Sequence, residues 1–287
     1  MTFEKSYSIP AKPAPVFELM TSPLHLPGWF AEQAEAGAKP GAPFRFWGKH
    51  TLWVPEASDA KQTLTQHAFP HALGFAWTWR GAPTEVTVKV AAEGEGARVD
   101  VKHAFARPWP ASDPELGPAH AARQDRIVEA FWDVAMANLA HYVFEGEPLL
   151  LPDYTAAGDA LELSLAIEAP AADVFGALTA PKQLDLWIAE HAQVELRKGG
   201  AYRFGWVAAD GAPLGPTQIA DFAPGERLAH DWCWPGEPPT QVRWELEENE
   251  PVTTLRVTHA RGARALAADT LLWCRALLAL RDRLTPK

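Results

Sequence analysis

The feature that most constrains the fold of this chain is an internal repeat. Residues 39–79 and residues 194–234 carry aromatic pairs and turn residues in the same order. At a constant offset of 158 residues, five positions upstream of these segments are also identical. These positions are Val16, Phe17, Thr21, Pro23 and Trp29, which recur as Val174, Phe175, Thr179, Pro181 and Trp187. The 287 residues therefore suit two copies of one domain, each large enough to bury its own core.

The repeat also predicts where the chain divides. A short proline- and glycine-containing segment separates the copies, and Pro148, Pro152 and Gly158 interrupt any regular element there. The predicted parts are a domain at 1–144, a linker at 145–159 and a domain at 160–287.

The second copy shows most clearly what each domain contains. Tyr202, Phe204 and Trp206 fall on alternate residues after a double-glycine turn, which is the period of a strand with one buried face. Asp210-Gly211 is typical of a hairpin turn, residues 217–222 form a second strand, and Pro224-Gly225 a second turn. A third strand ends in Trp232 and Trp234, which share a face. The segment predicts an antiparallel meander with an aromatic inner surface.

The remaining elements complete an α+β frame in both copies. We expect a strand at 3–9 and two short helices up to Trp29 in the first copy, with a strand at 161–167 and the same helices in the second. Two further strands follow each meander, at 85–90 and 97–105, and at 240–247 and 253–260. Each copy closes with a long helix whose apolar residues recur at steps of three and four. The stripes are Ile127, Phe131, Val134, Asn138 and Tyr142, and Leu266, Thr270, Trp273, Leu277, Leu280 and Leu284.

This order predicts the architecture. An antiparallel sheet with an aromatic face must bury that face, and the closing helix is the only long amphipathic element available. Each domain should therefore be a curved sheet that grips its last helix, with a cavity where packing is incomplete. The first copy carries Lys39-Pro40-Gly41 in place of the double glycine and has a proline-rich insertion at residues 107–118. We expect its turn to be degraded and its cavity to be filled or covered.

With these motifs the chain resembles a tandem of START-like helix-grip domains (SRPBCC superfamily, birch-pollen-allergen-like). It is most similar to the activator of heat-shock-protein-90 ATPase homologue family. The second copy carries the pattern as VF-x-A-L-T at 174–179, Trp187, K-G-G-x-Y-R-F at 198–204, G-E-R-L at 225–228, W-x-W at 232–234 and L-R-V-T-H at 255–259. The resemblance implies a cavity for apolar small molecules. It implies no single chemistry, because the superfamily includes lipid carriers, hormone receptors, aromatases, cyclases and stress-related proteins.

Composition excludes several classes of partner. The formal net charge is −10 without long charge runs, so nucleic acid and anionic membrane surfaces are poor partners. No apolar run reaches the length of a membrane span, and no secretory signal is recognisable, so we expect a cytoplasmic protein without membrane insertion. Cys233 and Cys274 are the only cysteines and should be reduced. Thirteen tryptophans favour wide apolar surfaces or an aromatic-lined cavity.

The histidines are the first candidates for chemistry. His103 and His259 alternate with apolar residues of their strands and should point inward. Such a histidine could orient a ligand or act as a general base, but the better-supported interpretation is a hydrogen-bonded core residue. His67 and His71 have a helical metal-ligand spacing, but Pro70 lies between them, so no metal is expected.

Other catalytic signatures are missing from the sequence. No G-x-S-x-G motif occurs, and Lys198-Gly199-Gly200 lacks the spacing of a phosphate loop. Cys233 should point away from the tryptophan face as an inert thiol. Arg45 and Arg203 should face solvent, where either could pair with an acidic neighbour. We therefore expect no catalytic residue, no metal and no cofactor.

Three functions remain open. The first is binding or carriage of an apolar, lipidic or aromatic small molecule, mainly in the second domain. The expected ligand-binding residues are Tyr202, Phe204, Trp232, Trp234, His259 and Trp273. The second is a cavity enzyme of the aromatase, cyclase or hydrolase type, which needs a polar cluster inside the pocket. The third, implied by the co-chaperone relatives, is a protein-interaction module that contacts a chaperone. Those relatives carry a different additional domain, where this chain has a second copy of the same one.

Overall fold

The computed structural model describes residues 1–106, 124–156, 158–208, 211–234, 237–260 and 267–285. The insertion at 107–118, Asp210 of the hairpin turn and Leu266 of the helix stripe lie outside these residues. Contacts divide the chain into two units: the first comprises Met1–Ala156 together with Leu266–Leu272, and the second comprises Ala157–Ala265 together with Trp273–Lys287. Each unit has the predicted α+β composition.

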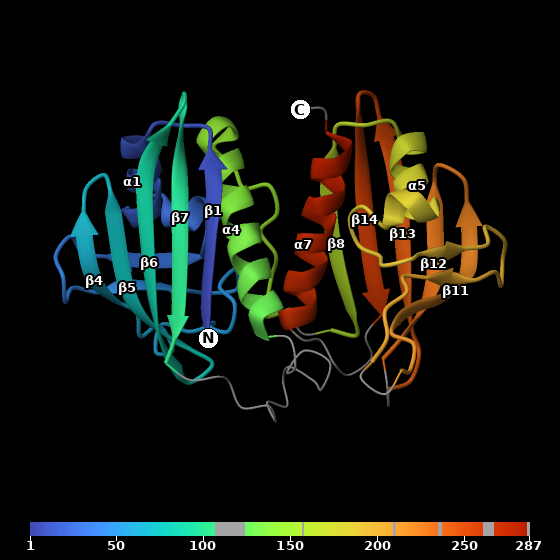
Figure 1. The fold of residues 1–287 in the computed structure, drawn as a ribbon, viewed down its shortest axis with the longest axis horizontal. Coiled ribbons are helices and arrows are strands. Elements are labelled where there is room, and N and C mark those ends of the chain that lie inside the picture. The colour runs from blue at the N-terminus through green and yellow to red at the C-terminus, as the bar shows by residue number, and fades with distance from the viewer. Residues whose placement is uncertain (107–123, 157, 209–210, 235–236, 261–266, 286–287) are drawn as a thin grey trace. The chain divides into compact units, whose positions relative to one another are not determined.

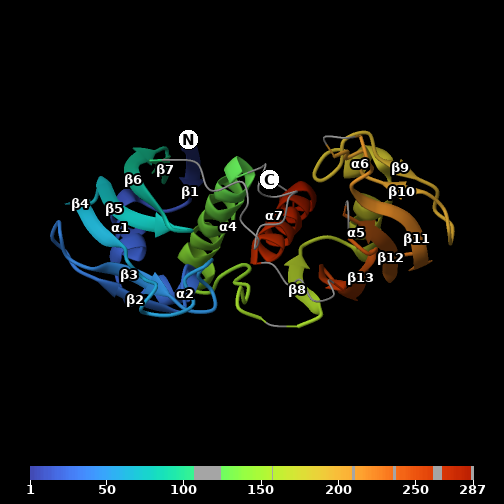
Figure 2. The same cartoon turned by 90° about the horizontal axis from the view of Figure 1, so that it is seen from below.

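The first domain has the expected order of elements (Figure 1). Its parts are β1 (Thr2–Ile9), α1 (Pro13–Thr21), α2 (Leu26–Trp29), β2 (Gln33–Ala36), β3 (Phe44–Trp47), β4 (Thr63–Ala68), β5 (Ala72–Trp79), β6 (Ala82–Glu93), β7 (Gly96–Phe105) and α4 (Gln124–Glu145). Five strands pair in the order β1-β7-β6-β5-β4, and β2 pairs with β3. A bridge between Pro43 and Thr63 joins β3 to β4, and α2 lies against β2 (Figure 2).

The second domain repeats this plan. Its parts are β8 (Ala160–Ile167), α5 (Ala171–Thr179), α6 (Pro181–Leu184), β9 (Gln193–Val194), β10 (Tyr202–Arg203), β11 (Gly215–Ala223), β12 (Arg227–Cys233), β13 (Thr240–Asn249), β14 (Val252–Ala260) and α7 (Ala267–Leu284). The five-stranded sheet has the order β11-β12-β13-β14-β8, and β9 pairs with β10. All of these pairs are antiparallel. Each copy thus has one strand, two short helices, six strands and a long helix among the described residues, and the predicted order of elements is confirmed.

Alternating burial explains why the helix lies where it does. Along β7 and β14 every second side chain is buried, including His103 and His259. Trp132 on α4 and Trp273 on α7 contact these histidines, so each long helix covers the apolar face of its own sheet. Each copy is therefore a sheet that grips its closing helix, as predicted.

Matching contacts in the two copies fix the short helices. The Trp29 indole donates to the Leu19 carbonyl at 3.1 Å, and the Trp187 indole donates to the Ala177 carbonyl at the same distance. Thr21 donates to a carbonyl one turn earlier in α1, as its counterpart does in α5. The 158-residue identities thus mark contacts that hold the short helices in place.

Two sequence expectations about the meander turns are wrong. Gly41 has φ +86° and Gly199 φ +74°, and each amide donates to the next strand, so the first copy keeps the turn. The first copy has Ala42 where the second has Gly200, and the space for its methyl group comes from Gly37, where any Cβ would lie 2.4 Å from that of Ala42. The strand expected through Trp206 ends at Arg203, because Gly205 turns at φ +76° against the backbone of Glu190.

The first part of the predicted linker is attached to the first domain. The Asn138 side chain accepts from the Leu150 amide and donates to its carbonyl, both at 2.9 Å. A His50 ring nitrogen lies 2.8 Å from the Pro152 carbonyl oxygen, and the Tyr154 amide donates to Lys49. These bonds hold residues 150–154 in place.

Candidate functional site

A chain of hydrogen bonds runs through the interior of the first domain from helix to sheet. The Trp132 indole N–H donates to His103 Nδ1 at 3.3 Å. His103 Nε2 lies 2.9 Å from Thr84 Oγ1, and the Thr84 hydroxyl donates to the Trp77 carbonyl at 2.9 Å. Because the hydroxyl proton is used on that carbonyl, His103 Nε2 must carry the proton that Thr84 accepts.

The second domain contains the same chain. The Trp273 indole donates to His259 Nδ1 at 3.1 Å, His259 Nε2 lies 2.9 Å from Thr240 Oγ1, and the Thr240 hydroxyl donates to the Trp232 carbonyl at 3.4 Å. In both copies the threonine precedes its histidine by 19 residues. We call each set the Trp-His-Thr chain.

These bonds leave neither histidine a free lone pair. A neutral imidazole accepts at one nitrogen only, and an indole N–H from the closing helix occupies that nitrogen in both copies. His103 is fully buried, and desolvation lowers its pKa from 6.5 to about 3. The described geometry therefore supports the structural interpretation of His103 and His259 as satisfied core residues.

A second buried polar cluster exists in the second domain and was missed at the sequence level. The Trp244 indole donates to His230 Nε2 at 3.1 Å, and His230 Nδ1 lies 3.3 Å from the Asp231 carbonyl. Burial, the largest cause, lowers the pKa of His230 to about 3. The Tyr202 ring lies 4.7 Å from this imidazole, and its hydroxyl donates to the Leu178 carbonyl at 2.7 Å. Burial raises the pKa of Tyr202 well above 10.

The six predicted ligand-binding residues lie on one connected aromatic surface. Trp232 is the centre: its ring centroid lies 5.3 Å from that of Trp273, 5.5 Å from His259, 5.8 Å from Trp234 and 6.1 Å from Phe204. Tyr202 extends the surface through Phe204 at 5.5 Å. Five of the six are buried, and Trp234 is half-buried.

Trp206 belongs to the same surface. Its ring lies 5.2 Å from Phe204 and 6.0 Å from Trp232, and it is half-buried. Gly215 gives it room, because a Cβ there would lie 3.1 Å from the Trp206 ring. The aromatic surface therefore reaches from the buried core at Trp273 to partly exposed rings at Trp206 and Trp234.

The corresponding interior of the first domain contains an additional aromatic ring on the closing helix. The centroid of the Phe131 ring lies 5.5 Å from that of Trp77, 5.0 Å from that of Trp79 and 5.8 Å from that of Phe30. With the helices aligned on the tryptophans that bind the strand histidines, Leu272 stands where Phe131 does. At the 158-residue offset Phe30 corresponds to an isoleucine. Two aromatic rings that fill the first interior are thus replaced by aliphatic groups in the second.

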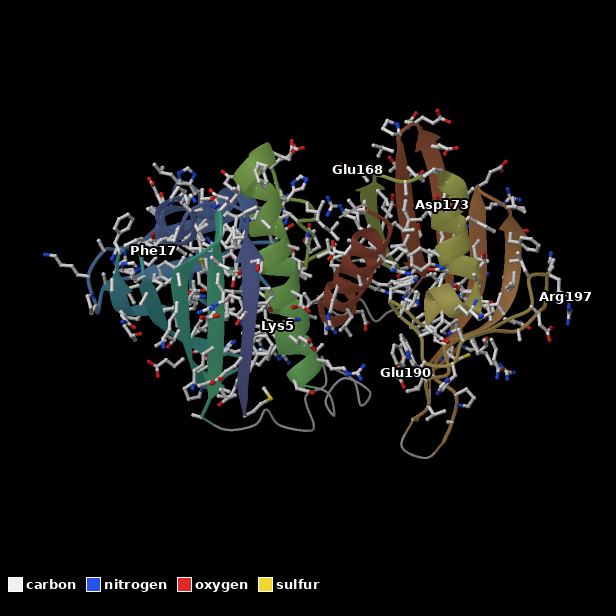
Figure 3. The ribbon with its side chains drawn as sticks, turned by 45° about the horizontal axis from the view of Figure 1, so that its top comes forward. Lys5, Phe17, Glu168, Asp173, Glu190 and Arg197 are labelled. Carbon is white, nitrogen blue, oxygen red and sulfur yellow. The ribbon has the colours of Figure 1, made fainter. Side chains whose placement is uncertain are left out.

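A partly exposed ionic cluster also distinguishes the copies. Lys5 lies on β1 next to α4 (Figure 3). Its Nζ is 2.7 Å from Asp133 and 3.3 Å from Glu129, both on α4, and the Tyr7 hydroxyl donates to Asp133 at 2.9 Å. Aligned as above, the second copy has Leu163 for Lys5. The cluster joins α4 to its sheet by charge, and the apolar Leu163 cannot form such a pair.

The other candidate residues have structural environments. Arg45 points away from the buried Phe44 and Phe46 and is partly exposed, as expected. It donates to the Ala60 carbonyl and pairs with the acidic neighbour Glu35 at 3.1 Å. Arg203 is exposed. His67 packs edge-on against Phe17, and His71 is exposed.

Metal and thiol chemistry have no support within the described residues. No group of three or more potential metal ligands occurs there. Cys233 is half-buried, Cys274 is buried, and both are free thiols. No helix in the described part of the chain is long and apolar enough to cross a membrane.

The family comparison covers most of the chain. The model of the family "Activator of Hsp90 ATPase homolog 1-like protein" matches residues 10–143 and 168–276, one match in each copy. A comparison with curated proteins gives no match.

Solved structures of similar proteins include both tandem and single-domain chains. DynU16, from the dynemicin biosynthetic locus, is 18% identical with 99% of each chain covered and a TM-score of 0.40. The di-domain ARO/CYC BexL from the BE-7585A biosynthetic pathway is 18% identical, with 100% of this chain and 99% of BexL covered and a TM-score of 0.39. The Aha1 dimer from Colwellia psychrerythraea is 20% identical, with 44% of this chain and 95% of that chain covered and a TM-score of 0.38.

Proposed function

The chain belongs to the family of Activator of Hsp90 ATPase homolog 1-like proteins, and from the interior of its second domain we propose that it binds a largely apolar small molecule there. The observation that carries the proposal is the aromatic surface centred on Trp232, which extends to the half-buried rings of Trp206 and Trp234. A ligand entering past these two rings meets Trp232, Trp273 and Phe204. Apolar contact at about 25 cal/mol per Å² gives useful affinity without a catalytic group.

The difference between the copies supports the choice of domain. In the first domain Phe131 occupies the space beside Trp77 and Trp79. Leu272 at the corresponding position of α7 is smaller and half-buried. We therefore assign ligand binding to the second domain, between α7 and the strands β12 and β14, and a filled interior to the first.

An enzyme that uses a cavity histidine as general base fits this geometry less well. A base needs an available lone pair within reach of the substrate proton. Indole N–H donors occupy the acceptor lone pairs of His230 and His259, with a nitrogen–nitrogen distance of 3.1 Å in each case. Turnover of an ester or polyketide-like substrate that is abolished in His259→Ala would replace the binding proposal with the enzyme. Chaperone contact remains a prediction from the family resemblance.

The test exchanges the helix residue between the copies. N-phenyl-1-naphthylamine, whose fluorescence rises in apolar sites, is titrated into the wild-type protein, Leu272→Phe and Phe131→Leu. We expect one site in the wild type, binding weakened about tenfold in Leu272→Phe because a ring fills the space, and a second site in Phe131→Leu. Trp232→Ala should also weaken binding. A wild type that binds no probe contradicts the proposal, as does a Leu272→Phe protein that binds like the wild type.

A further inference from the structure

Most of the shielded indole N–H groups in the described part of the chain have a hydrogen-bond acceptor. Five indoles donate at 3.1–3.3 Å to carbonyl or imidazole acceptors. The donors are Trp29, Trp132, Trp187, Trp244 and Trp273. Satisfaction of these groups is expected, because a buried donor without an acceptor costs about 1–3 kcal/mol.

Trp77 and Trp232 depart from this rule at equivalent positions of the two copies. Both indole nitrogens are shielded from solvent and have no hydrogen-bond partner within the described chain. The side chains are almost completely buried, with 3% of Trp77 and 4% of Trp232 exposed. The backbone carbonyl of each tryptophan also accepts a hydrogen bond from the threonine hydroxyl of its Trp-His-Thr chain. This bond fixes the backbone position of each tryptophan.

The surroundings of the two indoles differ. Trp77 is enclosed: the Trp79 ring lies 4.5 Å away, Phe46 lies 5.1 Å away and Phe131 lies 5.5 Å away. Around Trp232 the nearest ring, Trp273, is 5.3 Å away, and two neighbours are the half-buried Trp206 and Trp234. Among the described residues, the second indole is therefore the one with partly exposed aromatic neighbours, which a ligand from solvent can reach.

A buried water is a poor acceptor for Trp232 Nε1. An internal water needs two to four polar partners. The polar groups nearest along the sheet are Thr240 and His259, which already bond to each other at 2.9 Å. The Thr240 hydroxyl also donates to the Trp232 carbonyl, and His259 accepts from the Trp273 indole. The imidazole of His230, 6.1 Å away between ring centroids, is likewise engaged, because its Nε2 accepts from the Trp244 indole. An acceptor atom carried by a ligand can satisfy the N–H without needing a second polar partner from the protein.

We infer that Trp232 Nε1–H donates a hydrogen bond to the ligand, so that the second domain selects flat, apolar molecules that carry an acceptor such as a ketone oxygen. This inference rests on the proposed function and adds the ligand's chemical class. The ring faces of Trp206, Trp234 and Trp273 favour an aromatic body, which stacks on indoles in offset or edge-to-face geometry. The carbonyl oxygen accepts from Trp232.

The experiment compares two probes that differ at one carbon atom. 2-Acetylnaphthalene carries a ketone where 2-ethylnaphthalene carries a methylene group. Binding of each to the full chain is measured by equilibrium dialysis for the wild type, Trp232→Phe and the matched control Trp77→Phe. We expect the wild type to prefer the ketone by about fivefold, the worth of one ordinary hydrogen bond, with the preference lost in Trp232→Phe and kept in Trp77→Phe.

A second measurement on the unaltered protein covers the case in which Trp232→Phe does not fold. In a ¹H–¹⁵N spectrum with assigned indole signals, the ketone should move the Trp232 Nε1–H resonance downfield and the hydrocarbon should not. Equal binding of both probes, with no selective shift of that resonance, overturns the inference and leaves the proposed apolar binding intact. Binding of neither probe overturns both. Loss of the ketone preference in Trp77→Phe instead would place the donor in the first domain and also overturn the inference.

Discussion

Acid should destabilise the first domain through His103, and the size of the effect follows from its burial. The folded-state pKa is about 3, against 6.5 for the exposed group. Below pH 6.5 the unfolded chain takes up a proton that the folded chain refuses, so this contribution to stability is complete above pH 6.5 and is lost as the pH falls toward 3. At about 1.4 kcal/mol per pH unit, the loss between pH 6.5 and pH 5 is about 2 kcal/mol.

His103→Gln isolates this effect from the titration of carboxylates. The glutamine amide can accept from the Trp132 indole and donate to Thr84, as the imidazole does, but it does not titrate. The free energy of unfolding is measured with urea and tryptophan fluorescence at pH 7.5 and pH 5 for both proteins. We expect the wild type to lose about 2 kcal/mol more than His103→Gln. A difference between the two proteins that does not change with pH would refute the description of a neutral, buried imidazole.

Two further predictions concern the packing of the second domain. Leu277 is fully buried one turn after Trp273 on α7, so Leu277→Ala should lower the free energy of unfolding by about 2–5 kcal/mol, and an unchanged urea midpoint would contradict the grip of helix by sheet. Gly200→Ala should destabilise strongly because its Cβ would lie 2.1 Å from a carbonyl oxygen, whereas the control Gly176→Ala, in a helix with open space around it, should be neutral or stabilising by up to about 1 kcal/mol. Equal melting temperatures for these two glycine variants would argue against the close turn.

The fold could be predicted from the sequence because both copies of the repeat carry the same pattern of strand and helix periodicity. The order of the elements follows from alternation in strands and three-four spacing in helices, both of which are local properties. The turns were harder to predict. Ala42 stands where the second copy has Gly200. The space for the Ala42 methyl group is provided by Gly37, which lies five residues earlier, across the turn. Such an exchange shows only when the two backbones are seen in contact.

The site could be predicted in part. Alternation placed Trp232, His259 and Phe204 on one surface, and the structure brings them together. His230 offered the same signal, since it alternates with Trp232 on β12, but the repeat does not point to it, because the first copy has Phe75 at the corresponding position. The Trp-His-Thr chain joins a helix to two strands, so its distances depend on tertiary packing that no spacing rule gives. The repeated interval of 19 residues between threonine and histidine was the available clue.

The two copies show which parts of this interior belong to the scaffold and which differ by domain. Both keep the Trp-His-Thr chain, whose bonds tie the closing helix to the sheet without leaving a lone pair for catalysis. Only the first adds the ionic cluster around Lys5 and the filling ring of Phe131. Because the scaffold is common to both, the proposed difference in binding has to come from the residues that fill it. The proposal therefore depends on Leu272 in place of Phe131 on the closing helix, and on the Trp232 indole that has no hydrogen-bond partner within the described chain.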